Sequence, residues 1–330
     1  MVSLPVLVTG ATGGLGRVMV DSLLAQGRAV IASGRDPAIG AQLAASGARF
    51  IPADLAHDDL APLCEGVGSV FHLAALSSPW GSDDAFIKAN VLATTRLLKA
   101  ARKSGASRFV FASTPSVYTR AAHQIGLTER SPLPPRLVNA YARTKLMAEE
   151  AVLAAAAPGF AATALRPRAV IGPHDTVLLP RLLRAAAKGV MPLPGMGKAL
   201  IEPSDARDVA DAFLAAEARA EAVSGRVFNV SGGQPIALKD LAAHAFARMN
   251  RNVRLVPLPA RMVLALAHLA EGSAKLKPGH PEPPITAYSA MALGWSQTFD
   301  LAAAHRDLGW QPRRDPFSAI DWALEARNHA

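Results

Sequence analysis

The residue pair best suited to chemistry in this sequence is Tyr141 and Lys145, four positions apart at the start of an Ala- and Glu-rich run that favours a helix. Residues at this spacing share one helix face, with Cβ atoms about 5–6 Å apart. A free tyrosine has a pKa of about 10, and a neighbouring ammonium lowers it by favouring the phenolate. We therefore expect the pair to donate and accept a proton. Such a short pattern also arises by chance on a solvated helix face, so the surrounding residues decide between a catalytic pair and two ordinary surface residues.

A glycine-rich segment near the amino terminus predicts a dinucleotide site. The apolar run 4–9 is typical of a buried parallel strand, and a helix is expected to follow the glycine segment 10–16 and to end at Gln26. Glycines between a strand and a helix allow a tight turn and let a pyrophosphate reach the first amides of the helix. The spacing is Gly-x-x-Gly-x-x-Gly rather than the commoner Gly-x-Gly-x-x-Gly. The candidate cofactor residues of this turn are Gly10, Thr12, Gly13, Gly14, Leu15 and Gly16.

The end of the second predicted strand, 28–33, bears on the choice of cofactor. An acidic residue there would bind the adenosine ribose of NAD, whereas an arginine can bind the 2′-phosphate of NADP. Gly34 and Arg35 follow this strand, so we predict NADP, with NAD as the alternative. The competing structural explanation is that Arg35 pairs with Asp36 on the surface.

The later strands bring further candidates to the same edge of the sheet. Alternating strands and helices predict right-handed crossovers and a parallel sheet, which binds ligands at the carboxyl ends of its strands. Strands are expected at 49–52, 69–73, 108–112 and 161–165, with a long helix at 83–103. The residues that follow these strands or lie in this helix are Asp54, Leu55, Ala74, Ala75, Asn90, Thr114, Ser116 and Pro167.

Taken in order, these pieces resemble the extended branch of the short-chain dehydrogenase/reductase family over roughly residues 4–230. Segments 78–81, 113–117 and 175–181 resemble a subgroup within it, the 3β-hydroxysteroid dehydrogenase-like proteins and 2-alkyl-3-oxoalkanoate reductases. The main matching motifs are Thr-Gly-x-x-Gly-x-x-Gly at 9–16, Asp54-Leu55, Phe-His-Leu-Ala-Ala at 71–75, Asn90-Val91, Ser113-Thr114, Tyr141-x-x-x-Lys145 and Leu-Arg-Pro at 165–167.

The resemblance implies roles for the candidate residues. Tyr141 would be the general acid/base, and Lys145 would hold the nicotinamide ribose and lower the pKa of the tyrosine. Thr114 would hydrogen-bond the substrate oxygen. The residues implied to bind the cofactor are those of the glycine turn together with Arg35, Asp54, Leu55, Ala74, Ala75, Asn90, Tyr141, Lys145 and Pro167.

The chain is predicted to form a Rossmann-type, doubly wound α/β fold with a smaller, mainly helical lobe. Residues 1–168 would form the NADP-binding domain, completed by about 205–235, and residues 169–204 and 236–330 the substrate lobe. An apolar helix expected at 260–270 is either ordinary core or a wall facing an apolar substrate. Trp80 and Ser116 are the candidate substrate contacts.

The composition favours a globular, cytoplasmic protein. Half of the 330 residues are hydrophobic, and the single cysteine excludes an internal disulfide and suits a reducing compartment. The net charge of +9 is dispersed along the chain, which argues against a nucleic-acid platform. No apolar run is long enough for a transmembrane helix, and the histidines show no metal-ligand spacing, so we expect no metal. Peripheral membrane contact and a homodimer stay open.

The predicted function is an NADP(H)-dependent oxidoreductase that interconverts a ketone and a secondary alcohol on a bulky, apolar small molecule. A 3β-hydroxysteroid-like compound and a long-chain β-keto or β-hydroxy acid are the expected substrates. A nucleotide-sugar epimerase of the same fold is one alternative; a sugar 4,6-dehydratase would carry an acidic pair where Pro115-Ser116 stands. The second alternative is a non-catalytic NADP-sensing protein, and the Tyr141–Lys145 pair argues against it.

Overall fold

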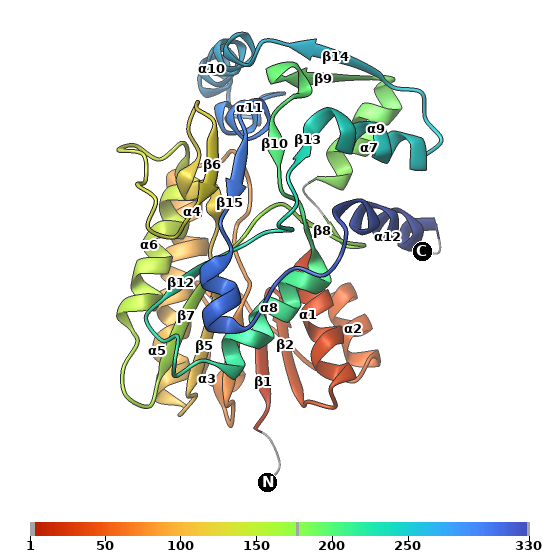
Figure 1. Cartoon of the computed structure of the whole chain (residues 1–330). Helices are drawn as coiled ribbons and strands as arrows, with labels where there is room; N and C mark the ends of the chain where they lie inside the picture. Colours follow the sequence, from red (N-terminus) through yellow and green to blue (C-terminus); the bar gives the residue numbers. More distant parts are fainter. Residues whose placement is uncertain (1–3, 176–177, 329–330) are drawn as a thin grey trace.

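The computed structural model describes residues 4–175 and 178–328, and shows a parallel sheet below a second group of elements (Figure 1). The ends of the predicted domains at residues 1–3 and 329–330 lie outside this description. Seven strands pair in the order β12-β7-β5-β4-β1-β2-β3, all parallel. They are β1 (Val6–Thr9), β2 (Val30–Gly34), β3 (Arg49–Pro52), β4 (Ser69–His72), β5 (Arg108–Ala112), β7 (Ala161–Pro167) and β12 (Val227–Val230).

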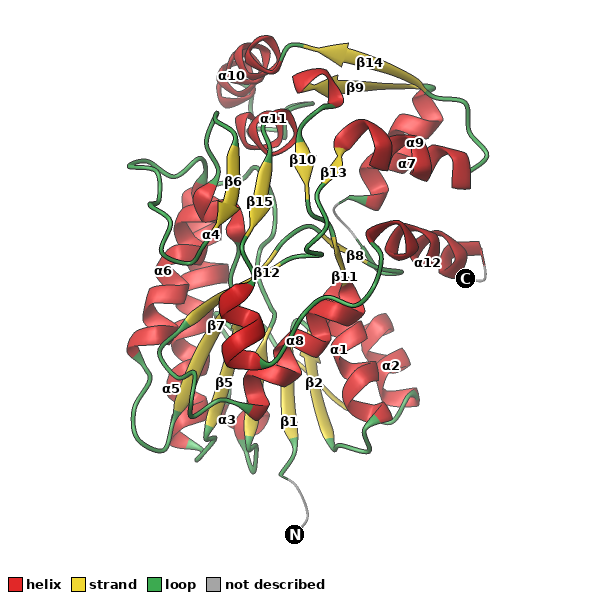
Figure 2. Ribbon diagram, in the orientation of Figure 1, coloured by secondary structure: helices red, strands yellow, loops and turns green. Residues whose placement is uncertain are grey.

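Helices cover both faces of this sheet, which is the doubly wound arrangement expected from the sequence (Figure 2). Along β1, Val6 and Val8 belong to one apolar core and Leu7 to the other, because successive side chains of a strand point to opposite faces. One face is covered by α1 (Gly14–Ala25), α2 (Pro37–Ala45) and α8 (Ala206–Ala218), and the other by α3 (Ala61–Cys64), α5 (Ala93–Lys103) and α6 (Ala140–Ala154).

The helix expected over 83–103 is interrupted by a π-helical segment. The structure contains α4 (Asp83–Phe86), a π-helix at Ile87–Leu92 and then α5. Such wider turns inside helices occur frequently at functional sites. Here the π-helix carries Asn90, whose buried side chain turns away from solvent.

The upper part of the molecule combines short two-stranded pairs with five helices of the described chain. Its helices are α7 (Leu179–Lys188), α9 (Leu238–Arg248), α10 (Ala260–Leu276), α11 (Ala287–Gly294) and α12 (Pro316–Asn328). Its strands are β6 (Gln124–Leu127), β8 (Val170–Ile171), β9 (Val190–Pro194), β10 (Leu200–Ile201), β11 (Ser204–Asp205), β13 (Ile236–Ala237), β14 (Arg254–Leu258) and β15 (Gln297–Phe299). Short 3-10 or π turns lie at Pro115–Tyr118, Gly195–Gly197 and Ala304–Leu308.

Helix α10 extends six residues beyond the predicted 260–270 and is buried on one face alone. Val263 and Ala267 pack in a small core with Ala290 of α11. Leu266 and Leu269, in contrast, are exposed. Within the described residues, no helix combines the length and apolar character needed to cross a bilayer.

Candidate active site

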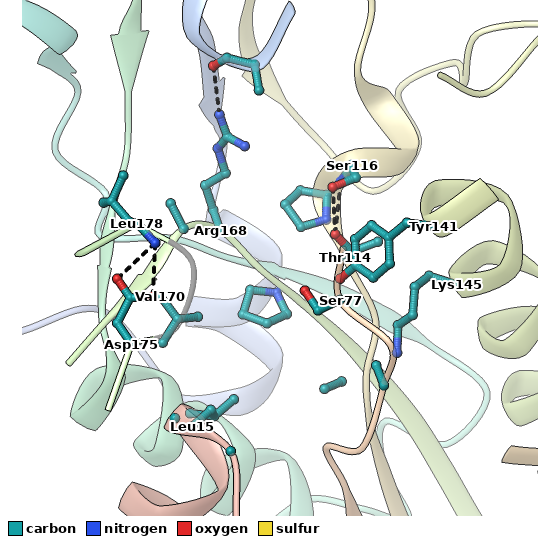
Figure 3. A pocket seen from close by; sticks show the side chains of 18 of the residues that line it. Leu15, Ser77, Thr114, Ser116, Tyr141, Lys145, Arg168, Val170, Asp175 and Leu178 are labelled. Carbon is teal, nitrogen blue, oxygen red and sulfur yellow. Dashed lines mark hydrogen bonds between the residues drawn. The ribbon is translucent and has the colours of Figure 1, made fainter. Parts of the chain in front are cut away.

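A cavity of about 400 Å³ lies where the carboxyl edge of the sheet meets the upper elements (Figure 3). Of the residues predicted for the site, it brings together those of the glycine turn other than Thr12, both members of the Tyr141–Lys145 pair, and Thr114, Ser116, Ala75 and Pro167. Its remaining lining is mostly apolar: Leu73, Pro79, Ala112, Pro115, Ala169, Val170, Leu178, Ile201, Pro203, Ala206, Ala292 and Leu293. No described residue of α10 lines the cavity, so this helix is not the expected wall; α11 takes that place.

The turn after β1 depends on its glycines. Gly10 has a φ of 69°, and a Cβ there would lie 2.6 Å from the backbone nitrogen of Ala74. A Cβ on Gly16 would lie 2.0 Å from the carbonyl oxygen of Gly10, so α1 can begin this close to β1 only without a side chain. Gly13 is the N-cap of α1, and no side chain in the described part of the chain caps the helix, which leaves its first amides available to phosphates. This cradle fits the pyrophosphate of a dinucleotide.

Thr12 and Arg35 lie on the β2 side of the turn, outside the cavity lining. The Thr12 side chain packs on Gly34, where a Cβ would come within 2.5 Å of its hydroxyl oxygen. Arg35 is exposed, and Asp36 does not pair with it: the Asp36 carboxylate accepts the amides of Ala38 and Ile39 and so caps α2. The Arg35–Asp36 ion pair, which was the alternative to a cofactor role for Arg35, is therefore absent from the described chain.

Asp54 and Leu55 are likewise outside the cavity lining. The Asp54 carboxylate accepts the backbone amide of Ala56 at 2.9 Å and lies 3.3 Å from the ring of His57. These contacts lower the pKa of Asp54, the Ala56 hydrogen bond most, and Arg35 also contributes. Leu55 is buried in the core beneath α5.

Tyr141 lies in the first turn of α6, which begins there because Asn139 accepts the amide of Ala142 at 2.9 Å. Burial raises the pKa of Tyr141, and the nearby phenol of Tyr288 raises it further; hydrogen bonds with Thr114 and Ser77 act in the opposite direction. Figure 3 shows the three hydroxyl-bearing side chains, Tyr141, Thr114 and Ser77, gathered on one wall of the cavity.

Lys145 is buried, with 2% of its surface exposed, one turn further along α6. Its ammonium lies 3.9 Å from the centre of the Phe111 ring. Burial lowers the pKa of Lys145 to about 7, although the negative charge of Glu149 acts to raise it. The expected lowering of the Tyr141 pKa by Lys145 does not hold in this geometry. The tip of Lys145 points away from the Tyr141 hydroxyl, and burial dominates the tyrosine (Figure 3).

Thr114 and Ser116 belong to a chain of hydroxyls at the end of β5. Thr114 donates to the Ser116 hydroxyl at 2.9 Å and accepts the Ser116 amide at 3.2 Å. The Ser116 hydroxyl in turn lies 2.9 Å from the phenol of Tyr288 on α11. Tyr288 comes from a segment for which the sequence offered no motif.

Asn90 and Ala74 hold the loop after β4 rather than line the cavity. The Asn90 side chain accepts the Leu76 amide at 2.8 Å and donates to the Leu76 carbonyl at 3.3 Å and to the Thr144 hydroxyl at 3.1 Å. It therefore ties the loop that carries Ser77 to the helix that carries Tyr141, and acts as a positioning residue. The backbone of Ala74 packs against Gly10.

Trp80 also lies outside the cavity lining. Its indole N–H donates to the carbonyl of His280 at 2.8 Å, which links the loop after β4 to the segment after α10. The cation of Lys275 lies 6.0 Å from its ring. Trp80 therefore connects the two parts of the molecule at the rim of the site.

A buried polar network that the sequence did not predict lies next to the Tyr141–Lys145 pair. Arg166 donates through Nε to the carboxylate of Glu149 at 2.8 Å and through Nη2 to its other oxygen. The Ser113 hydroxyl donates to the same carboxylate at 2.5 Å, and Arg166 also donates to the phenol of Tyr118. Glu149 stands four residues after Lys145, so its position on the same helix face was the signal available in the sequence.

The fold and the cavity define a dinucleotide-binding α/β enzyme with a tyrosine–lysine pair at the cofactor edge of its sheet. The profile of the NAD dependent epimerase/dehydratase family matches residues 6–231, and the chain belongs to this family, the extended short-chain dehydrogenases/reductases. It is an oxidoreductase acting on CH–OH groups.

Three curated relatives show where in the family the chain falls. It is 36% identical to protein YbjS of Escherichia coli over 93% of both chains. It is 34% identical to the 2-alkyl-3-oxoalkanoate reductase of Stenotrophomonas maltophilia, over 93% of this chain and 94% of that protein. The human sterol-4-alpha-carboxylate 3-dehydrogenase, decarboxylating, is 32% identical over 69% of this chain and 65% of its own. The resemblance to the 3β-hydroxysteroid dehydrogenase-like and oxoalkanoate reductase subgroup is thereby confirmed.

A solved structure of similar fold is MoeE5 in complex with UDP-glucuronic acid and NAD. It superposes with a TM-score of 0.78 and 26% identity over 98% of this chain and 99% of that one. The predicted fold class is therefore confirmed.

Proposed function

We propose that this protein is an NADP(H)-dependent oxidoreductase that interconverts a ketone and a secondary alcohol on a bulky, mainly apolar small molecule. The substrate would be 3β-hydroxysteroid-like or a long-chain β-keto or β-hydroxy acid. One observation carries the proposal: the hydroxyls of Tyr141, Thr114 and Ser77 converge in the cavity that also contains the glycine turn. This arrangement would let a proton donor and further hydrogen-bond donors face a single substrate oxygen.

Each residue has a defined part in the reduction. When bound, the nicotinamide supplies the hydride. Tyr141 is protonated at neutral pH because burial raises its pKa, so it can give its proton to the oxygen that becomes the alcohol. The Thr114 hydroxyl, which donates to Ser116 in this structure, would turn to donate to the same oxygen while charge develops on it. Lys145, in the same cavity, would bind the nicotinamide ribose.

The lining of the cavity supports an apolar substrate. Most of its side chains are aliphatic or proline, and an apolar ligand gains free energy by displacing water from such a surface. Two of the curated relatives are named for oxoalkanoate and sterol-carboxylate substrates. MoeE5, which binds a nucleotide sugar, is less similar in sequence, at 26% identity.

NADP is the cofactor that the end of β2 favours. Arg35 is exposed there with no ion pair in the described chain, so its guanidinium is available to a 2′-phosphate. The adjacent carboxylate, that of Asp36, accepts backbone amides at the start of α2 and so is not offered to a ribose. Asp54 and Leu55 would flank the adenine from beyond β3.

A substrate panel tests the proposal. The purified protein with NADPH or NADH is offered steroid ketones, 3-oxo acids of increasing chain length, and UDP-glucose or UDP-glucuronic acid, while cofactor absorbance and sugar epimers are followed. We expect NADPH oxidation with the apolar ketones, faster as the chain lengthens. Turnover of the nucleotide sugars alone would replace this function by the epimerase, and cofactor binding with no turnover of any substrate would favour the sensing protein.

The setting proposed for this activity is the cytoplasm. Cys64 is buried and burial raises the pKa of its thiol to about 11, so it stays a structural thiol suited to a reducing compartment. We propose a small-molecule substrate rather than nucleic acid as the partner. A homodimer through helices of the cofactor-binding sheet, and peripheral contact of the exposed face of α10 with a membrane, complete the proposal.

A further inference from the structure

Arg168 is a second arginine at the end of β7, and its environment is unlike that of Arg166. Arg166 is buried beside the carboxylate of Glu149, which takes two of its N–H groups. Arg168 is 7% exposed and has no carboxylate within ion-pair distance in the described chain. Among the described residues, its one side-chain hydrogen bond runs from Nη2 to the carbonyl of Ala292 at 3.5 Å, and its buried Nε has no partner there (Figure 3). A guanidinium has five N–H donors, so most of its capacity is unused.

The backbone holds Arg168 firmly in this position. Its amide donates to the carbonyl of Val230 at 2.8 Å, and its carbonyl accepts the hydroxyl of Ser204 at 2.6 Å. The next residue, Ala169, has a φ of 42°, a left-handed conformation that costs about 1–2 kcal/mol for a residue with a Cβ. Such strain persists where the surrounding structure fixes it, and it gathers at binding sites.

The neighbouring carboxylate, that of Glu202, makes no ion pair with Arg168 in the described chain, although the two charges interact. One Glu202 oxygen accepts the Ser231 hydroxyl at 2.5 Å and the other accepts the Phe299 amide at 3.3 Å. Burial disfavours the charged form of both groups. It raises the pKa of Glu202, against the effect of the Arg168 charge, and it lowers the pKa of Arg168. A buried cation without a paired anion is costly, because it loses hydration without compensation.

Arg168 shares its cavity with the hydroxyl groups proposed to bind the reacting oxygen. It lines the same cavity as Tyr141 and Thr114. The phenol of Tyr288 is close enough to influence the pKa of both Tyr141 and Arg168, and it contacts Ser116 in the hydroxyl chain. The guanidinium and the proton donor therefore share Tyr288 as a neighbour within one cavity. A 3-oxo acid has its carboxyl carbon and its keto carbon separated by a single carbon, so a carboxylate held in this cavity stays close to the keto group.

We propose that Arg168 binds the carboxylate of the substrate, so that the protein selects 3-oxo or 3-hydroxy acids over neutral ketones and alcohols. The free Nε and Nη donors form the planar fork that binds two carboxylate oxygens side by side. This inference rests on the proposed function and narrows its substrate to a carboxylated one. Arg181, which also lines the cavity but donates to the Ser289 hydroxyl at 3.4 Å, adds positive charge to this side.

The test compares a charged substrate with its masked form. 3-Hydroxymyristate, its methyl ester and a neutral secondary alcohol of similar length are oxidised by the full-length protein with NADP or NAD, and cofactor reduction is followed. In the unmodified protein, kcat/KM for the acid should exceed that for the ester on the order of 10- to 100-fold, the usual worth of hydrogen bonds to a charged group. Arg168→Met should bring this ratio close to one. Arg184→Met, which removes an exposed arginine of α7, should leave it unchanged.

A second readout separates binding from folding. Because Arg168 is buried without an ion pair, Arg168→Met should leave the unfolding temperature unchanged or raise it, whereas loss of a structural contact would lower it. If the methionine variant does not fold, Arg168→Gln carries the same test with a polar side chain. A ratio near one in the unmodified protein, or a ratio that survives both substitutions, overturns the proposal while leaving the oxidoreductase function intact.

The remaining outcomes are also decisive. If no alcohol is oxidised with either cofactor, the proposed function fails and this inference with it. If UDP-glucose competes with the acid and Arg168→Met abolishes that competition, Arg168 serves a diphosphate and the carboxylate assignment is wrong.

Discussion

At the scale of single residues, the site is governed by burial more than by pairing. Burial raises the pKa of Tyr141 and lowers that of Lys145 to about 7, so the tyrosine is kept as an acid. The Tyr–Lys spacing was enough to predict two residues that line one cavity. It could not predict that Lys145 would turn toward Phe111, because a shared helix face does not fix where a long side chain ends.

Arg35 is the residue whose replacement should change cofactor preference. Arg35→Ala removes the guanidinium at the end of β2, so NADPH should bind on the order of 10- to 100-fold more weakly while NADH binding changes little. Fluorescence titration with the two cofactors measures both affinities. Lys99→Ala, at an exposed site on α5, serves as the charge control. Equal weakening of NADH and NADPH would show that Arg35 has no role at the 2′-phosphate.

At the scale of elements, the strand ends and the loops between them form the site. The repeated strand–helix pattern and the glycine turn predicted the sheet and its binding edge, since these follow from local periodicity and from backbone geometry. The π-helix around Asn90, the hydroxyl chain to Tyr288 and the Arg166–Glu149 pair were missed, because they depend on contacts between residues far apart in the sequence.

Asn90 provides a test of this positioning at the element scale. Asn90→Leu leaves the backbone groups of Leu76 and the Thr144 hydroxyl without their partner, so the free energy of unfolding should fall by about 1–3 kcal/mol. Since Leu76 adjoins Ser77, kcat should fall more than KM rises. Urea unfolding and steady-state kinetics measure the two effects. Thr95→Val, which removes a peripheral helix hydroxyl, should change the free energy of unfolding and kcat only slightly. Equal effects from the Asn90 and Thr95 variants would argue against the role of Asn90.

At the scale of the whole molecule, a histidine at the centre of the sheet couples stability to pH. His72 is fully buried between Thr9 at 2.7 Å and Thr94 at 2.8 Å, joining β1, β4 and α5. Burial, assisted by the charge of Lys145, lowers the pKa of His72 to about 3 from 6.5. The ring therefore stays neutral in the folded protein under conditions in which it is protonated in the unfolded chain.

The expected consequence is loss of stability in mild acid. Between pH 6.5 and 3 the unfolded state binds one more proton at this site, so stability is complete above about pH 6.5 and falls as the pH decreases. From pH 7 to pH 5 the loss due to His72 should be about 2 kcal/mol. Urea unfolding of the unmodified protein and of His72→Gln at both pH values gives the difference. The same pH dependence in both proteins would refute this assignment.

The measurement that tests the central claim most directly is NADPH-dependent ketone reduction by Tyr141→Phe. Because Tyr141 is the proton donor, kcat should fall by about 10²- to 10⁴-fold, while NADPH still binds within about threefold of the unmodified protein. A Tyr288→Phe variant keeps the donor and should lose far less. If Tyr141→Phe reduced the ketone at a rate close to that of the unmodified protein, the catalytic role of the tyrosine would be contradicted.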